Sequence, residues 1–460
     1  MTTPPAPVQR RRDSRPAALV RARIAVYLTF FANGVGFSNL VPRYPEVLTH
    51  LGITKAAFGQ ALMFTSIGGL VAGLAASWLI NRLTSAKVAS LGMVVLGLGL
   101  LSAGLADSWI VFALSMAWVG GIDAIVDVAQ NAHGLRVERR WGGSIITSFH
   151  AAWSLGAVAG AAMGQALAGA GVPIGWHMAG VLVLLTVVSW SAVPWTIKGP
   201  DSDDRRLPGF AEDPAVTGGT SDPLGGALVD GAAGAGPASS PVDVDADKAA
   251  LAVPRAGAGS VSGARALPIA LIAVLVGVLG LMCAAAMFPE DVAASWSSLL
   301  LTEQGAGASL AGMGMVALQG VMIAGRLVGD AVIDRLGARA VIAGGGVLVM
   351  SGMGVALVMG SVPGTILGLM VAGAGCAVAV PVAYAASDDI PGLRPGQGLT
   401  LVSWLARVIM LIAPPVVGWF ADAHGTWVAL VYGLLGGLVL TVSWLALAAG
   451  PRPNATSAAS

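Results

Sequence analysis

The sequence predicts an all-α integral membrane protein whose twelve transmembrane helices form two six-helix pseudo-repeats. The first observation is composition: of 460 residues, 56% are hydrophobic and 11% charged, with mean hydropathy +0.79, whereas soluble domains carry about a quarter charged residues. The second is that the apolar residues form runs of about 20, the length that crosses a bilayer core as a helix. These runs lack the alternation of barrel strands. The third is a polar segment that divides the runs six and six.

The N-terminal tail, residues 1–23, is basic and leads directly into the first apolar run. A secretory signal is the alternative, but no small-residue cleavage site closes this run. We therefore expect an uncleaved first helix. The predicted spans are 24–42, 56–80, 87–106, 109–131, 144–169, 174–195, 268–290, 307–329, 339–360, 363–386, 398–421 and 426–449.

Residues 196–265 are rich in Gly, Ala, Pro, Ser and Asp and contain no apolar run. Such a composition cannot bury enough apolar surface to order itself. We predict a disordered cytoplasmic linker between an N-terminal bundle, 24–195, and a C-terminal bundle, 266–449, which a short tail, 450–460, follows.

The basic residues of the short connections predict the orientation. With a cytoplasmic N-terminus, the outside loops hold only Arg43 and Lys55, and the remaining Lys and Arg of the connections lie inside. Because inside loops are enriched in Lys and Arg, both termini are expected in the cytoplasm and the protein in the plasma (inner) membrane. Trp109, Trp176 and Trp427 then fall at outer helix ends, where an aromatic belt is expected.

Several function classes have no support in the sequence. A net charge of +1 gives no electrostatic footprint for nucleic acid. Both cysteines lie in apolar runs and the five histidines are scattered, so no metal site is expected. Without a nucleophile elbow or a phosphate-binding loop, we expect neither an enzyme, nor a cofactor, nor ATP-driven transport.

The two halves show a weak internal repeat. The inner end of the eighth span, residues 325–339, contains Arg335-Leu336, which corresponds to Arg82-Leu83 at the inner end of the second. Parallel repeats of this kind describe one large transporter architecture. The stretch 325–339 resembles the loop signature of the major facilitator superfamily. The resemblance implies a rocker-switch transporter with gating residues Gly325, Arg326, Gly329, Asp330, Asp334, Arg335 and Arg339.

Further local motifs are similar to one branch of that superfamily, the YbjJ-type inner-membrane permeases near the fucose–proton symporters. These motifs are Arg43-Tyr44-Pro45, Asp127 through Asn131, Phe149 through Gly156, Glu290, and Trp296-Ser297.

Ionisable residues inside the membrane are costly and usually functional. Asp123, Asp127 and Asn131 follow at four-residue steps and share one helix face. Depth in the membrane favours Asp123 as a proton-coupling residue. The resemblance favours Asp127, since Asp-x-x-x-Asn matches the symporters' Glu-x-x-x-Asn, so Asp127 ranks first and Asp123 second. The alternative is that both lie near the inner interface and are simply hydrated.

Six polar residues are candidates for substrate binding, and four of them have a structural alternative. His150 could only pack, Asn33 could join helices, Glu290 could be an acid of an outer loop, and Arg407, near the midplane, could pair with a neighbouring acid. The full set is Asn33, Asn131, His150, Trp153, Glu290 and Arg407.

Together these features predict a monomeric secondary active transporter that moves a small polar metabolite, such as a sugar or sugar derivative, with protons across the lipid bilayer. An exporter of drugs or metabolites with the same fold is one alternative. A transporter-like solute sensor is another, although the only cytoplasmic segment available for output is the linker.

Overall fold

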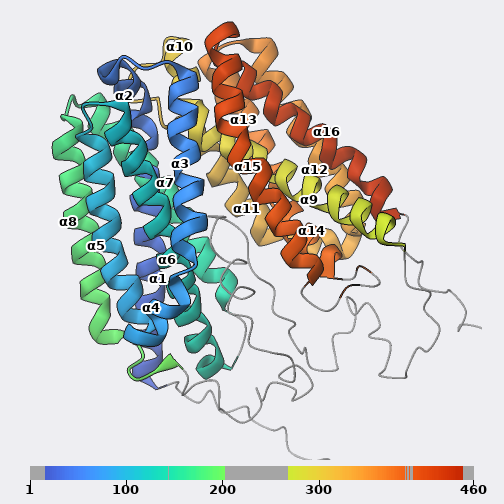
Figure 1. The fold of residues 1–460 in the computed structure, drawn as a ribbon. Coiled ribbons are helices and arrows are strands. Elements are labelled where there is room, and N and C mark those ends of the chain that lie inside the picture. Colours follow the sequence, from blue (N-terminus) through green and yellow to red (C-terminus); the bar gives the residue numbers. More distant parts are fainter. Residues whose placement is uncertain are drawn as a thin grey trace, which may run out of the picture.

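The computed structural model describes residues 16–142, 145–201, 268–388, 390, 393 and 397–448. Two helical halves lie side by side, one for each predicted bundle (Figure 1). The N-terminal half consists of α1 (Ala17–Asn39), the 3-10 turn η1 (Val41–Arg43), α2 (Tyr44–Leu51), α3 (Lys55–Gly73), α4 (Ala76–Leu83), α5 (Ser85–Gly104), α6 (Trp109–Trp141), α7 (Ile146–Gly169), α8 (Ile174–Ala192) and the 3-10 turn η2 (Val193–Trp195).

The C-terminal half repeats this plan. It consists of α9 (Ile269–Asp291), the π-helical turn η4 (Val292–Trp296), α10 (Ser297–Glu303), α11 (Met313–Leu336), α12 (Ala338–Met359), α13 (Val362–Cys376), α14 (Ala379–Asp388), α15 (Gln397–His424) and α16 (Val428–Ala448). Within the described ranges, nine helices are long and apolar enough to cross a membrane, and three more are apolar but shorter. The predicted all-α, twelve-span fold class is confirmed.

Several spans differ in detail from the sequence prediction: the second is divided into α3 and α4, the eighth runs on to Leu336, and three more differ as follows. The fourth, α6, continues ten residues beyond the predicted end at 131. The tenth is interrupted between α13 and α14. The seventh does not end at Glu290, because the chain continues through η4 into α10 and ends at Glu303. Glu290 consequently lies about 20 Å from that end, at 1.5 Å per residue, and is not an acid of an outer loop.

Close backbone packing holds α1 against α7 in the N-terminal half. A Cβ atom on Gly156 of α7 would collide with the main-chain oxygen of Phe31 of α1. Small residues let transmembrane helices approach in this way, since lipid offers no hydrophobic drive for helix association. The contact fixes the α7 face that carries Trp153 against α1.

The two halves meet at the end of the molecule that carries α2 and α10 and diverge toward the other end (Figure 1). We call these the closed end and the open end. At the closed end the first turn of α3 contacts the C-terminal half: Lys55 forms an ion pair with Glu303, and its backbone N–H donates to Asp422 Oδ1 of α15 at 2.7 Å. Gly59 lies against the main chain of Pro414, where a Cβ atom has no room. Thus α3 and α15 join the two halves.

The described residues 196–201, at the start of the predicted linker, pack against the N-terminal half. Arg136 is 1% exposed and donates to the carbonyls of Gly199 and Pro200 at 3.2 and 3.1 Å. Asp201 lies 3.4 Å from the same guanidinium and accepts from the backbone N–H of Ser85. A buried guanidinium needs acceptors, and residues 199–201 supply them. This first part of the predicted linker is therefore packed on the N-terminal half. The remainder of 196–265 and the tail 450–460 lie outside the described residues.

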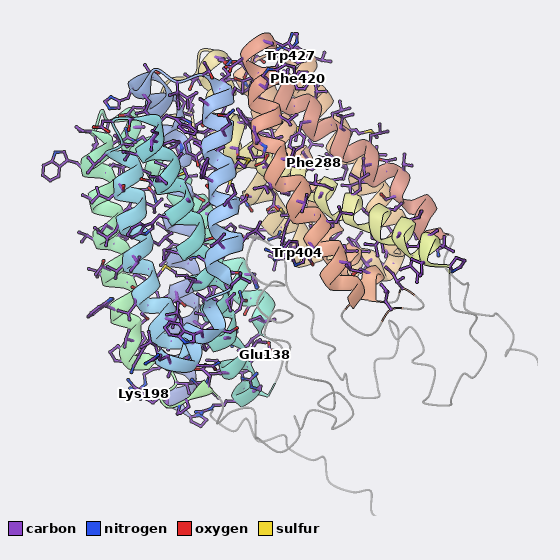
Figure 2. The ribbon with its side chains drawn as sticks, in the orientation of Figure 1. Glu138, Lys198, Phe288, Trp404, Phe420 and Trp427 are labelled. Carbon is purple, nitrogen blue, oxygen red and sulfur yellow. The ribbon has the colours of Figure 1, made fainter. Side chains whose placement is uncertain are left out.

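The two ends differ in chemistry. Trp427 and Phe420 lie at the closed end, and Glu138 and Lys198 lie at the opposite end of the N-terminal half (Figure 2). Trp176 at the start of α8 is 77% exposed, as expected of an interfacial aromatic residue.

Candidate functional site

A cavity of about 230 Å³ lies between the two halves. Elements of both halves form its wall, including α1, α3 and α6 on one side and α9, α11 and α15 on the other. The lining combines apolar side chains with a few polar ones. Its polar and aromatic members are Phe37, Tyr44, Thr65, Ser66, Asp123, Trp153, Glu290, Asp291, Ser295 and Gln319.

Asp123 ends a hydrogen-bonded chain that crosses three helices. Trp153 Nε1 donates to Asn33 Oδ1 at 2.7 Å, and Asn33 Nδ2 donates to Asp123 Oδ1 at 2.9 Å. Because an indole N–H can only donate, the Asn33 oxygen must face Trp153 and its NH₂ must face Asp123. Asp123 Oδ1 is therefore an acceptor, and a proton on this carboxyl group would reside on Oδ2.

Asp127 belongs to a separate local arrangement one turn further along α6. Its Oδ1 accepts from Asn131 Nδ2 at 3.1 Å and from Gln130 Nε2 at 3.2 Å, all within the same helix. Neither Asp127 nor Asn131 is among the described residues that line the cavity. The helical spacing does place both aspartates on one face, but only Asp123 reaches the cavity.

Glu290 lies on the opposite wall and contacts two residues of α11. Gln319 Nε2 donates to Glu290 Oε1 at 3.2 Å, and Arg326 Nη2 lies 3.9 Å from the same oxygen. Arg326 Nη1 also donates to Ser154 Oγ of α7 at 3.4 Å. The guanidinium, which was expected only as part of the gating signature, thus links Glu290 to the N-terminal half.

Among the lining residues that were not predicted from the sequence, two bear on the charge and hydrogen bonding of the site. Asp291 follows Glu290 directly and lines the same cavity, with Ser295 Oγ donating to its Oδ1 at 2.8 Å. Gln319 is a buried amide in an apolar helix. Each could have been found by the rule that singled out Glu290, namely a polar side chain inside a transmembrane run. Asp291 was missed because the sequence prediction ended the seventh span at residue 290.

The remaining candidates do not line the cavity within the part of the chain that the structure describes. Asn33 lies one step behind Asp123. His150 packs edge-on against Phe30, with ring centroids 5.2 Å apart. Arg407 is half-buried on α15. Their predicted contact with substrate stays a prediction.

The residues of the gating signature, 325–339, lie in two different environments. Gly325 and Gly329 lie against Ala377 and Val378, at the junction of α13 and α14. Arg335 and Arg339 are exposed near the end of α11 and the start of α12. The side chains of Asp330 and Asp334 fall outside what the structure describes. In the described ranges, no group of three His, Cys, Asp or Glu residues is placed to hold a metal ion.

Two relatives of known sequence are named as transporters. No family model matches the chain. An uncharacterized MFS-type transporter of Yersinia pestis is 23% identical over 426 residues, 92% of this chain and 94% of the relative. An uncharacterized transporter of Sinorhizobium fredii is 24% identical over 404 residues, 86% of this chain and 89% of the relative.

Solved structures resemble the whole chain in fold. A nucleoside transporter, NupG, has a TM-score of 0.60 at 12% identity and covers 95% of this chain and 100% of its own. A D-xylose–proton symporter has a TM-score of 0.57 at 13% identity, with 92% and 97% covered. The chain therefore has the twelve-helix fold of the major facilitator transporters.

Proposed function

We propose that this chain is a secondary active transporter that moves a small polar metabolite, such as a sugar or sugar derivative, together with protons by alternating access. The observation that carries the proposal is a cavity shared by two halves that meet at one end and diverge at the other. Its volume of about 230 Å³ lies below the roughly 300–1,000 Å³ of drug-sized ligand sites. The cavity thus favours a small metabolite over the alternative of a bulky drug.

The charge at the open end supports the orientation. Arg335 and Arg339 are exposed there, and Arg139 and Arg140 belong to the last turn of α6. By the positive-inside rule, the open end faces the cytoplasm of an inner membrane and both termini are cytoplasmic. The described conformation is then inward-facing. The motifs that resemble the YbjJ-type inner-membrane permeases support the choice of the inner membrane.

Asp123 is the proposed proton carrier. It lines the cavity, and its Oδ1 accepts from Asn33 while Oδ2 remains for an exchangeable proton. The placement of Asp127 outside the cavity ranks it second, the reverse of the order that the motif favours. Glu290 and Trp153 are the proposed substrate contacts, while Arg326, Gly325 and Gly329 take part in gating. The likeness in fold to a D-xylose–proton symporter supports such coupling.

Proteoliposome transport tests the proposal. A thermal-shift screen of purified protein against sugars and sugar derivatives selects a labelled solute. Asp123→Asn should still exchange this solute down its gradient and lose accumulation driven by a pH gradient, because Asn keeps the shape but carries no exchangeable proton. Asp107→Asn, in an exposed loop between α5 and α6, is the control. If Asp127→Asn uncouples transport and Asp123→Asn does not, the carrier is Asp127. Wild-type protein that never accumulates any solute under a pH gradient would refute proton coupling.

A further inference from the structure

The charge of the cavity wall is one-sided. Three carboxylates line it, those of Asp123, Glu290 and Asp291, and none of the described lining residues is Lys, Arg or His. A carboxylate in such a place requires a partner or a proton. The way each of the three meets this requirement differs.

Two of the carboxylates have a partner or a role already. Glu290 accepts from Gln319 and lies 3.9 Å from Arg326 Nη2, so its charge is offset within the protein. Asp123 accepts from Asn33 and is the proton carrier of the proposed function.

Asp291 differs from both. Its Oδ1 accepts from the neutral hydroxyl of Ser295 at 2.8 Å, and its Oδ2 is buried and has no hydrogen-bond partner among the described residues. No described Lys, Arg or His forms an ion pair with it. When it is ionised, this carboxylate therefore has no cationic partner within the described chain.

A second group in the same wall also lacks a donor. Gln319 is 2% exposed. Its NH₂ group is used by Glu290, and its Oε1 has no partner within the described chain. A buried acceptor without a donor costs free energy, and such groups in native proteins call for an explanation. Asp291 and Gln319 thus each hold a buried acceptor without a donor within the described chain, and a partner that satisfies them must donate.

The aromatic part of the lining suits a positive charge. Phe37, Tyr44 and Trp153 all contribute to the cavity wall. Aromatic faces attract ammonium groups, and the attraction strengthens where water is excluded. An anionic group would meet three carboxylates instead, with no basic residue in the described lining.

We propose that the substrate carries one protonated amine, which binds Asp291, while its hydroxyl or other donor groups bind Gln319. The inference rests on the proposed transport function and narrows its substrate class to amine-bearing small metabolites, such as amino sugars. A single cation matches the single uncompensated carboxylate. Neutral analogues bind more weakly, and carboxylate analogues are excluded.

Matched sets of ligands test the amine on purified full-length protein. Glucosamine, glucose and glucuronate form one set, and 2-phenylethylamine, 2-phenylethanol and phenylacetate form another. Binding is measured by thermal shift and isothermal calorimetry. Within a set that binds, the amine should bind about 10- to 100-fold more tightly than the alcohol, the ratio expected for one charge-assisted hydrogen bond. Equal or tighter binding of the alcohol or the acid overturns the inference, and so does the failure of every amine in the sets to bind.

Asp291→Asn tests the assigned residue. This variant should lose the preference for the amine over the alcohol, whereas Asp107→Asn should keep it. Size-exclusion chromatography and retained binding of the alcohol verify the fold, and Asp291→Glu, which keeps the charge, should restore part of the preference if the Asn variant is unstable. An Asn variant that keeps the preference but loses pH-driven accumulation would make Asp291 a proton site and overturn the inference. Amine binding without pH-driven transport would leave the inference standing and refute the proposed coupling.

Discussion

Asp422 links the two halves at the closed end through the first turn of α3. Its Oδ1 accepts the backbone N–H of Lys55 at 2.7 Å, and its Oδ2 accepts that of Ala56 at 2.9 Å. The first N–H groups of a helix have no intrahelical acceptor, so a carboxylate of α15 caps a helix that belongs to the other half. Separation of the halves at this end must break both bonds, and Asp422→Ala should therefore favour opening of the closed end.

The structure sets the size of the effect. Replacing a side-chain cap by Ala costs about 1 kcal/mol, and a negative charge at a helix N-terminus adds about 0.3–1 kcal/mol at an exposed site. Asp422 is exposed, so we expect a total of about 1–2 kcal/mol, which changes an equilibrium about 5- to 30-fold. The ion pair of Lys55 with Glu303 remains, so the variant should shift the population rather than abolish the closed state.

Spin-label distances measure this shift. Labels at His50→Cys and Ala423→Cys lie on exposed positions of α2 and α15, one in each half, and both native cysteines are buried. Asp422→Ala should raise the long-distance population about 5- to 30-fold relative to the short one. Asp107→Ala, an exposed acid of the loop between α5 and α6, is the matched control and should leave the distances unchanged. The reasoning fails if the distance distribution of Asp422→Ala superimposes on that of the parent, or if the control shifts equally.

Two further variants test the gate and the charge of the site. Gly329→Leu places a side chain against Val378, where a Cβ atom already has no room. Such overpacking costs about 1–3 kcal/mol, so transport flux should fall while the affinity measured by thermal shift is kept, and a parallel loss of affinity would place Gly329 in the binding site. Arg407→Gln should leave the affinity ratio between amine and carboxylate ligands unchanged, because Arg407 is outside the described lining. Its effect should appear in the amount of folded protein in the membrane. A loss of carboxylate binding or a gain in amine binding on removing this charge would contradict its placement outside the site.

The sequence identified several polar residues of the site but not which of them reach the cavity or contact one another. Asp123 and Glu290 were identified because charges inside apolar runs are rare and costly, and both line the cavity. The choice between Asp123 and Asp127 could not be made by spacing, since both share one helix face. Depth in the membrane favoured Asp123, which reaches the cavity, whereas the motif favoured Asp127, one turn further along the helix.

Contacts between the halves were beyond sequence reasoning. Lys55 was recognised only as a charge in an outside loop, and Glu303 and Asp422 had no pattern that marked them. Their meeting depends on how α3, α10 and α15 pack. The same holds for Arg326, whose motif predicted gating while its contact with Glu290 and Ser154 needed the placement of α7, α9 and α11.

The number of spans, their order and the division into two halves were determined by the sequence itself. Membrane insertion depends on local apolar length, and each spanning segment must satisfy its own backbone hydrogen bonds as a helix. Which polar groups share the cavity was decided only by the tertiary structure. Helix rotation and close packing at residues such as Gly156 and Gly59 set which face of each helix points inward, and these contacts join residues far apart in the chain that no local pattern connects.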